Sequence, residues 1–147
     1  MVTIQVSNLI DFVAEVFDRS ESSPEEARRI ATYLTTANLT GHDSHGVIRV
    51  PLYVQWKKMG SVIPDQTIEV DTSNFFDGEI SRYVDFVRAT KPVAGVDAVL
   101  IPGDPEKKMR ADRTRNGVPL LDDSWAAIVN TAREVGVNEA SIQRAVS

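Results

Sequence analysis

The chain has 147 residues, 42% of them apolar and 25% charged, a composition that suits one globular domain rather than a disordered chain. It contains no cysteine, which excludes disulfides and thiolate chemistry, and its net charge of −5 argues against nucleic-acid binding by bulk charge. No apolar run is long enough to span a membrane and residues 1–5 do not resemble a signal peptide, so we expect a cytoplasmic protein without membrane or nucleic-acid partners.

Two amphipathic helices are predicted in the first 40 residues. Apolar side chains recur at helical spacing over about 7–19, which predicts the first helix. The second is predicted over about 24–39, because Ser23 suits an N-cap and Pro24 suits the first helical position. Glu26 stands three residues after Ser23, so we expect these two side chains to form a capping box.

The middle of the chain predicts both helices and strands. A third helix is expected from about 47 to Gly60, with Pro51 in its first turn, where a missing N–H is tolerated. Alternating side chains predict a strand at 67–71, and helical spacing predicts a helix at about 78–90. A second strand is expected at 96–101.

The last third is expected to be mainly helical. Asp104 is the expected cap of a polar helix that ends near Gly117, and residues 118–121 are expected to be extended. Asp122 or Asp123 is expected to cap a further helix that stops at Gly136, and 137–147 forms one last short helix. Together these elements predict an α+β fold, a mostly helical single domain with two or three short strands.

A dense polar segment separates the second and third predicted helices. It holds both histidines of the chain between Gly41 and Gly46, and its polar residues are His42, Asp43, Ser44, His45, Arg49 and Tyr53. A loop histidine exchanges protons near neutral pH, and an arginine binds a carboxylate bidentately. These residues suit a site for a small 2-oxo or 2-hydroxy acid. The alternative is a helix-capping loop in which Asp43 or Ser44 caps and His45 is solvated.

Other candidate sites carry weaker signals. His42 and His45, with Asp43 between them, lack a supporting ligand set elsewhere, so we expect no metal site. The basic residues of 107–115 are interrupted by acidic ones, which favours a solvated helix face over a phosphate or polyanion site. The two tryptophans are expected in the core or at an interface, and no glycine-rich phosphate loop follows a predicted strand.

The residues of the polar segment resemble a known family. The run ANLTGHDSHGVIRVPLY at 37–53 resembles the signature of the malate/L-lactate dehydrogenase family, which is distinct from the Rossmann lactate and malate dehydrogenases. The helix start at 23–27 resembles the family's N-terminal region. From Ile68 onward the resemblance is to the family's C-terminal region, carried by 75–88, by the turn at 99–106, by Arg113 and by Gly117-Val118-Pro119-Leu120.

This resemblance implies a particular domain organisation. Family members are more than twice as long as this chain, so the central nicotinamide-binding domain is implied to be missing, with the junction near 63–68. The chain is then a single domain over 1–147, made of an N-terminal family segment (1–66) joined directly to a C-terminal family segment (67–147). In the family, these two segments form one discontinuous domain, with the cofactor domain inserted between them.

The resemblance also implies roles at matching positions. His45 is implied to be the catalytic acid/base, Arg49 to hold the substrate carboxylate, and Ser44 and Tyr53 to line the substrate pocket. The acidic partner of the histidine and nearly all NAD(P) contacts lie in the family's central region. We therefore expect no cofactor site in this chain.

The resulting functional hypothesis is a cofactor-domain-deleted 2-hydroxy acid oxidoreductase. It is expected to transfer no hydride alone and to act as a dimerising or small-acid-binding module, since family members are homodimers. Two alternatives stay open. One is a cofactor-free enzyme that acts on an oxo acid through His45 and Arg49, and the other is a subunit that pairs with a separate cofactor-domain chain.

Overall fold

The computed structural model describes residues 1–66, 75–92, 95 and 98–147. Its elements in chain order are β1 (Val2–Ile4), α1 (Val6–Arg19), α2 (Pro24–Leu39), the 3-10 turns η1 (Asp43–His45) and η2 (Val47–Arg49), α3 (Val50–Lys58), α4 (Phe75–Arg88), α5 (Asp104–Asn116), β2 (Val118–Leu120), α6 (Asp122–Glu134) and α7 (Glu139–Val146). This is the mostly helical α+β fold that the sequence predicts. No helix in these ranges is both long and apolar enough to cross a bilayer.

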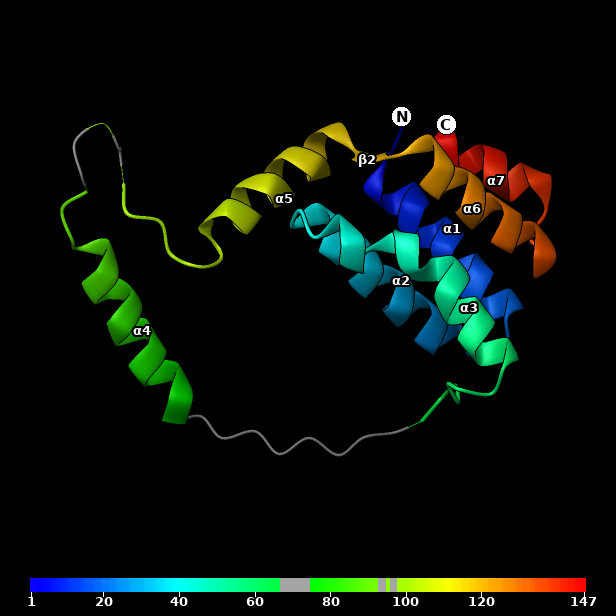
Figure 1. Ribbon diagram of the computed structural model, residues 1–147, viewed down its shortest axis with the longest axis horizontal. Helices are drawn as coiled ribbons and strands as arrows, with labels where there is room; N and C mark the ends of the chain where they lie inside the picture. The colour runs from blue at the N-terminus through cyan, green and yellow to red at the C-terminus, as the bar shows by residue number, and fades with distance from the viewer. Residues whose placement is uncertain (67–74, 93–94, 96–97) are drawn as a thin grey trace.

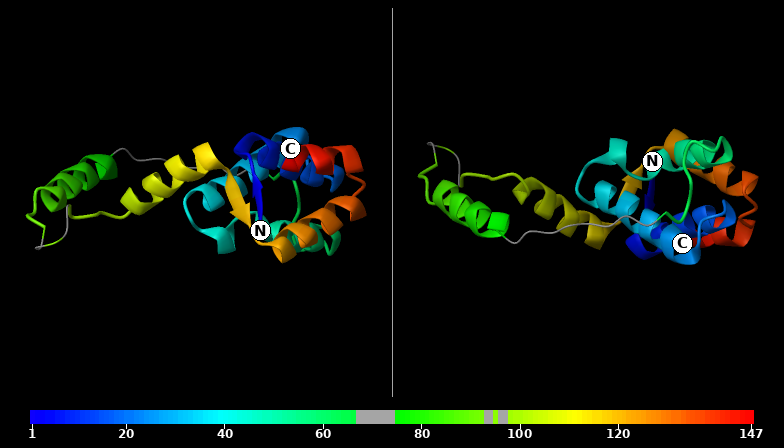
Figure 2. Two further views of the ribbon diagram at one scale, coloured as in Figure 1. Left: turned by 90° about the horizontal axis from the view of Figure 1, so that it is seen from above. Right: turned by 90° about the horizontal axis from the view of Figure 1, so that it is seen from below.

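Five helices and both strands form one helical body (Figure 1). Within it α1 packs against α2 and α7, and α3 packs against α6. The helix α5 contacts α2, and its N-terminal end projects away from this body, while α4 lies apart from the body in all three ribbon views (Figures 1 and 2). Ile80 and Tyr83 on α4 are accordingly exposed.

The core of the helical body is built from the apolar stripes that predicted the helices. The buried side chains of α1 are Leu9, Phe12, Val13, Val16 and Phe17. They meet Ala31 and Leu34 of α2 and Ile128 of α6 in one cluster. Trp125 joins this cluster as expected, with its ring 5.1 Å from that of Phe12. Burial of this apolar surface is the main force that holds the body together.

The strands differ from those expected. β1 pairs antiparallel with β2, so that Val2 faces Leu120 and Ile4 faces Val118. The extended segment at 118–121 was expected, but β1 was not, because three residues carry too little alternation to be recognised. The strand expected at 67–71 lies outside the described residues. Of the strand expected at 96–101, residues 98–101 form no strand and 96–97 lie outside the described part.

The start of α2 shows a cap that differs from the expected capping box. Ser23 Oγ accepts the Glu26 N–H at 3.3 Å, as expected. Glu26 does not return the bond: its carboxylate accepts the backbone N–H of Asp65 at 2.7 Å, and the Asp65 carboxylate accepts the Ser23 N–H at 3.1 Å. The reciprocal half of the cap thus comes from a residue 42 positions away.

Other helix ends lie within three residues of the expected positions. The N-cap of α5 is Gly103 rather than Asp104, and the N-cap of α6 is Leu121 rather than either aspartate that follows. The helices α3 and α6 stop just before Gly60 and Gly136, which adopt φ of 71° and 84°. Glycine adopts such φ values at the least steric cost, which suits these two residues to end their helices.

Candidate functional site

The polar loop between α2 and α3 is held by Arg113 from α5. Its guanidinium donates to both carboxylate oxygens of Asp43, at 2.6 and 3.0 Å, and also to the backbone carbonyl of Asn38. The Arg113 side chain is 12% exposed, whereas that of Asp43 is 52% exposed. The mostly buried arginine therefore holds the exposed loop against α5, although Arg113 and Asp43 are 70 residues apart in the sequence.

Asn38 completes this attachment from the last turn of α2. Its amide nitrogen donates to Asp43 at 2.7 Å, and its amide oxygen accepts the Val47 N–H at 2.8 Å. A Cβ on Gly46 would lie 2.0 Å from that amide oxygen, so the loop passes Asn38 too closely for any other residue. We name Asn38, Asp43 and Arg113 the loop clamp.

The loop clamp changes the acidity of its carboxylate. The hydrogen bonds from Arg113 lower the pKa of Asp43 below its usual value, as do the hydrogen bond from Asn38 and the charges of Arg113 and His42, while partial burial opposes the shift. A carboxylate with a lowered pKa in the folded state stabilises the fold while it is ionised.

This shift predicts a loss of stability in acid. The contribution of Asp43 is present above its unfolded-state pKa of about 3.9 and is lost as the pH falls towards the lower folded-state value. We expect no more than about 1 kcal/mol from it, because Asp43 is half exposed and solvent screens the pair. Urea unfolding at near-neutral pH and in acid measures this loss, and Asp43→Asn should lose less stability than the native chain over the same interval. An equal loss in both proteins would contradict the prediction.

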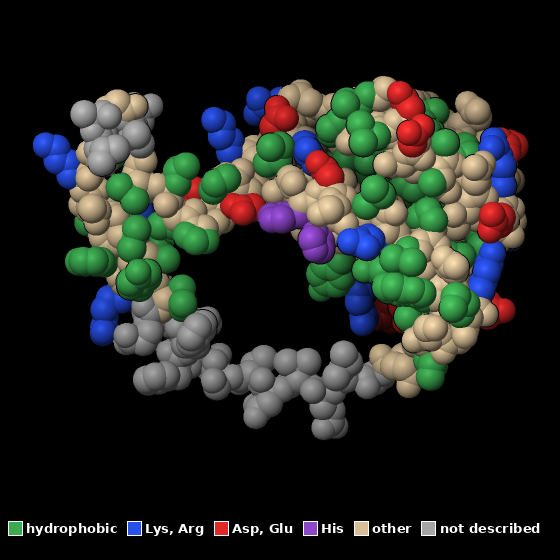
Figure 3. All heavy atoms as spheres, viewed as in Figure 1, with side chains coloured by type: hydrophobic (Ala, Val, Ile, Leu, Met, Phe, Trp, Pro, Cys, Tyr) green, Lys and Arg blue, Asp and Glu red, His purple; other side chains and the backbone are tan. Residues whose placement is uncertain are grey.

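Three of the sequence-predicted site residues lie together on this loop. The Ser44 hydroxyl and His45 Nδ1 share a hydrogen bond of 3.0 Å, and Arg49 Nε donates to the Ser44 carbonyl at 2.8 Å. Ser44 and His45 are exposed, whereas Arg49 is half-buried. Figure 3 shows both histidines, in purple, side by side on the surface. The His45 imidazole and the Arg49 guanidinium are thus both hydrogen-bonded to Ser44.

Tyr53 lies one helical turn beyond Arg49, on α3. Its ring stacks on that of Trp56, with centroids 5.5 Å apart, and it packs against the core. Trp56 is 38% exposed and does not belong to the core. That Tyr53 lines a substrate pocket stays a prediction.

A cavity of 450 Å³ lies beside the loop, between η2 and the end of β2. Ser44, Asp43 and Arg113 supply its polar wall, and Ile48 and Leu121 supply part of its apolar wall. Its volume falls within the range of small-molecule pockets. Of the four predicted site residues, Ser44 lines this cavity, while His45, Arg49 and Tyr53 are outside its lining.

The basic residues of 107–115 are exposed, as expected for a solvated face, with the exception of Arg113. Most of α5 is exposed, and Met109 is 39% exposed, but Met109 and Arg113 are four residues apart and therefore lie on one side of this helix. A Cβ added to Gly41 would lie 3.4 Å from the Met109 side chain. Met109 is the largest apolar residue of α5, so its position could have indicated which arginine faces inward.

The sequence predicts no metal site at His42, Asp43 and His45 of the same loop. Among the residues that the structure describes, no group of three His, Asp or Glu side chains is arranged to hold a metal ion. The histidines instead bond to neighbouring hydroxyls, and His42 Nδ1 lies 3.1 Å from Thr40 Oγ1.

Known proteins are similar to this chain in the sequence of its N-terminal part and in its fold. Residues 4–75 match the family of malate/L-lactate dehydrogenases. Hydroxycarboxylate dehydrogenase B of Escherichia coli strain K12 is 45% identical over 47 residues, which are 32% of this chain and 13% of that protein, and the O157:H7 protein of the same name matches equally. The sequence likeness to malate/L-lactate dehydrogenases thus covers nearly half of the chain.

A solved structure extends the likeness in fold to the rest of the chain. It is described as a "putative malate/lactate dehydrogenase" from E. coli and superposes with a TM-score of 0.75 at 13% identity, over 97% of this chain and 98% of the other. At this identity the likeness concerns the fold alone. The sequence match, by contrast, spans only 13% of the curated relatives' length.

Proposed function

We propose that this chain is the host part of a malate/L-lactate dehydrogenase-type protein, which binds a small 2-hydroxy or 2-oxo acid and transfers no hydride alone. The observation that carries the proposal is the linked geometry of Ser44, His45 and Arg49. Arg49 is oriented through Nε, and no other hydrogen bond or ion pair engages its guanidinium within the described residues. Its terminal nitrogens suit a carboxylate, and His45 suits proton exchange with the neighbouring hydroxyl or carbonyl oxygen.

Contacts between the two family segments support a single domain over 1–147. The pairing of β1 with β2 and the bond of Arg113 to Asp43 both join residues of 1–66 to residues of 67–147. Such contacts let the two segments share one core, as a domain that hosts an insertion requires.

The described residues offer no dinucleotide site of the Rossmann type. In that type, a nicotinamide dinucleotide is bound where a glycine-rich turn joins a strand to a helix N-terminus. The two strands in the described part lead into α1 and α6 through Gln5 and Leu121, without glycine. We therefore derive no hydride step here and propose that any cofactor is brought by another chain or protomer, in a homodimer or with a separate cofactor-domain subunit.

Titration with small acids tests the proposal. L-lactate, L-malate and pyruvate are added while the imidazole proton signals of the two histidines are followed by NMR. We expect the His45 signal to shift on binding, and Arg49→Gln to weaken binding about tenfold or more, because a charge-assisted bond contributes about 1.5–3 kcal/mol. Arg115→Gln, an exposed arginine on α5, is the matched control and should leave binding unchanged.

Three other outcomes separate the alternatives. Binding that is unaffected by Arg49→Gln would refute the carboxylate role. Oxidation of reduced nicotinamide by the chain with pyruvate would refute the loss of hydride transfer. Deuterium exchange into the pyruvate methyl group, abolished by His45→Ala, would indicate the cofactor-free enzyme instead.

A further inference from the structure

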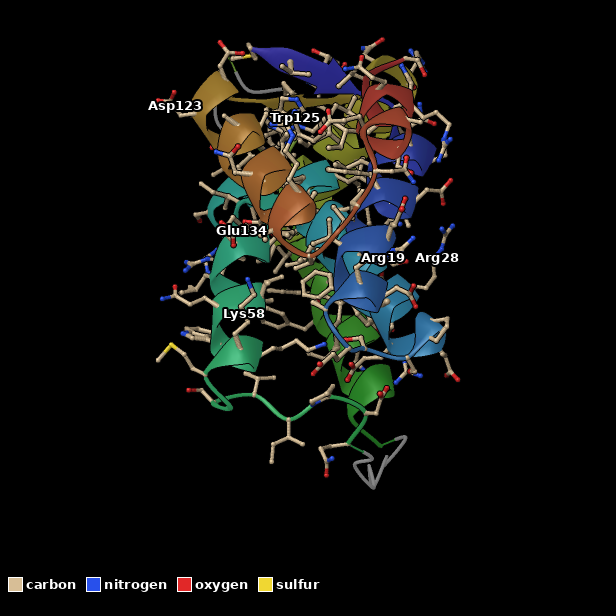
Figure 4. The ribbon with its side chains drawn as sticks, turned by 90° about the vertical axis from the view of Figure 1, so that its right-hand side faces the viewer. Arg19, Arg28, Lys58, Asp123, Trp125 and Glu134 are labelled. Atoms are coloured by element: carbon tan, nitrogen blue, oxygen red, sulfur yellow. The ribbon has the colours of Figure 1, made fainter. Side chains whose placement is uncertain are left out.

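A second cleft lies away from the polar loop, where the C-terminal ends of α1, α3 and α6 meet. Its volume is 440 Å³, and its lining includes Arg19, Glu21, Val54, Lys57, Lys58 and Glu134. Figure 4 shows Arg19 on one side of this region, and Lys58 and Glu134 on the other. The cleft thus combines an apolar floor at the buried Val54 with charged walls.

The two adjacent lysines of this cleft have different surroundings. Lys57 is half-buried, and its Nζ donates to the hydroxyl of Ser22 at 2.6 Å; Ser22 itself is 5% exposed. Lys58 is exposed and forms a surface ion pair with Glu134 at 3.2 Å. The Lys57 amine is therefore held in place inside the cleft wall, whereas Lys58 is an ordinary solvated lysine.

Burial also alters the chemistry of the Lys57 amine. It lowers the pKa of Lys57, although the negative charges of Glu26, Asp65 and Glu21 oppose the shift. A lysine with a lowered pKa is a free amine for a larger fraction of the time near neutral pH, and the free amine is the nucleophile.

A cation that is free to bind an anion completes the cleft. Arg19 forms no ion pair or hydrogen bond through its side chain within the described residues, although it lines the same cleft as Lys57. A guanidinium whose nitrogens are not engaged by other side chains can bind a carboxylate through two parallel hydrogen bonds. The cleft therefore suits a small molecule that carries a carboxylate and an electrophilic carbon.

We propose that Lys57 is a reactive amine that forms an imine with a small carbonyl compound bearing a carboxylate, such as a 2-oxo acid. The Nζ lone pair attacks the carbonyl carbon while Arg19 pairs with the carboxylate. Both protons of the free amine pass to the former carbonyl oxygen, which leaves as water as the C=N bond forms. The step is redox-neutral and consumes no other reactant. It uses none of the residues of the polar loop.

Reductive trapping of the full chain tests the proposal. The protein is incubated near neutral pH with glyoxylate and cyanoborohydride, which reduces an imine to a stable amine, and adducts are located by peptide mass spectrometry. We expect several-fold more adduct on Lys57 than on Lys58, Lys91, Lys107 or Lys108. Equal labelling of Lys57 and Lys58 would overturn the proposal.

Matched variants separate the parts of the proposal. Arg19→Gln should reduce the glyoxylate adduct several-fold and leave the adduct with acetaldehyde, which has no carboxylate, unchanged; an equal effect on both would remove Arg19 from the site. Lys57→Arg should abolish the adduct in a chain whose circular dichroism is native, whereas Lys58→Arg should retain it. Arg49→Gln should not change labelling, so this test is independent of the proposed acid site.

Discussion

Replacing Gly46 by alanine is expected to destabilise the protein by about 2–4 kcal/mol, because the new methyl group would displace a buried hydrogen-bonded amide. The added Cβ would lie 2.0 Å from Asn38 Oδ1, and Asn38 is 1% exposed. The backbone at Gly46 has φ of −88°, which alanine adopts without strain, so the cost comes from the contact alone. Either the loop moves outward or Asn38 gives up its bonds to Asp43 and Val47.

A double-mutant cycle distinguishes this contact from a general loss of helix or loop stability. Asn38→Ala removes the clashing amide, so Gly46→Ala should cost much less in that background than in the native chain. Urea unfolding of the four proteins gives the free energies. Additive costs, or a cost of Gly46→Ala below about 0.5 kcal/mol, would show that the loop accommodates a Cβ.

The helices could be predicted because their signals are local. The stripe of α1 and the Ser23-Pro24 start of α2 lie within one segment each, and the structure confirms both. The extended segment of β2 was also predicted, but β1 was not, since it is three residues long and its partner β2 lies more than a hundred residues later. Pairing at that distance leaves no pattern in either segment. The same holds for Asp65, whose bond to Ser23 replaces half of the expected capping box.

The sequence predicted which residues form the candidate site, but not which residue of α5 holds their loop in place. His45, Ser44 and Arg49 stand out because polar residues and glycines interrupt a helical pattern, and the structure places the three together. Arg113 stands out only through the family resemblance, and its contact with the loop was not predicted, since α5 carries several arginines with similar neighbours. Only the packing of α5 on α2 makes it different from Arg115, and a charge pattern does not encode packing.

Replacing Arg113 by alanine should release the loop from α5. We expect a loss of about 1–2 kcal/mol, since the change removes a bidentate bond to Asp43 and one of the two donors to the Asn38 carbonyl, which still accepts the Gly41 N–H at 3.0 Å. The exposure of Asp43 keeps the cost below that of a fully buried pair. Arg115→Ala, on the same helix and exposed, is the matched control and should change stability by less than about 0.5 kcal/mol.

Arg113→Ala should also weaken acid binding, although Arg113 is not proposed to contact the acid. Asp43 adjoins Ser44, whose carbonyl orients Arg49, so a loosened loop should weaken acid binding in the histidine NMR titration. Arg113→Ala should also raise the pKa of Asp43 towards its usual value and abolish the extra acid sensitivity of the native chain relative to Asp43→Asn. Arg113 is then a positioning residue. If binding weakened but the acid sensitivity of the native chain persisted, the pKa of Asp43 would be set by Asn38 and His42, and Arg113 would act through packing.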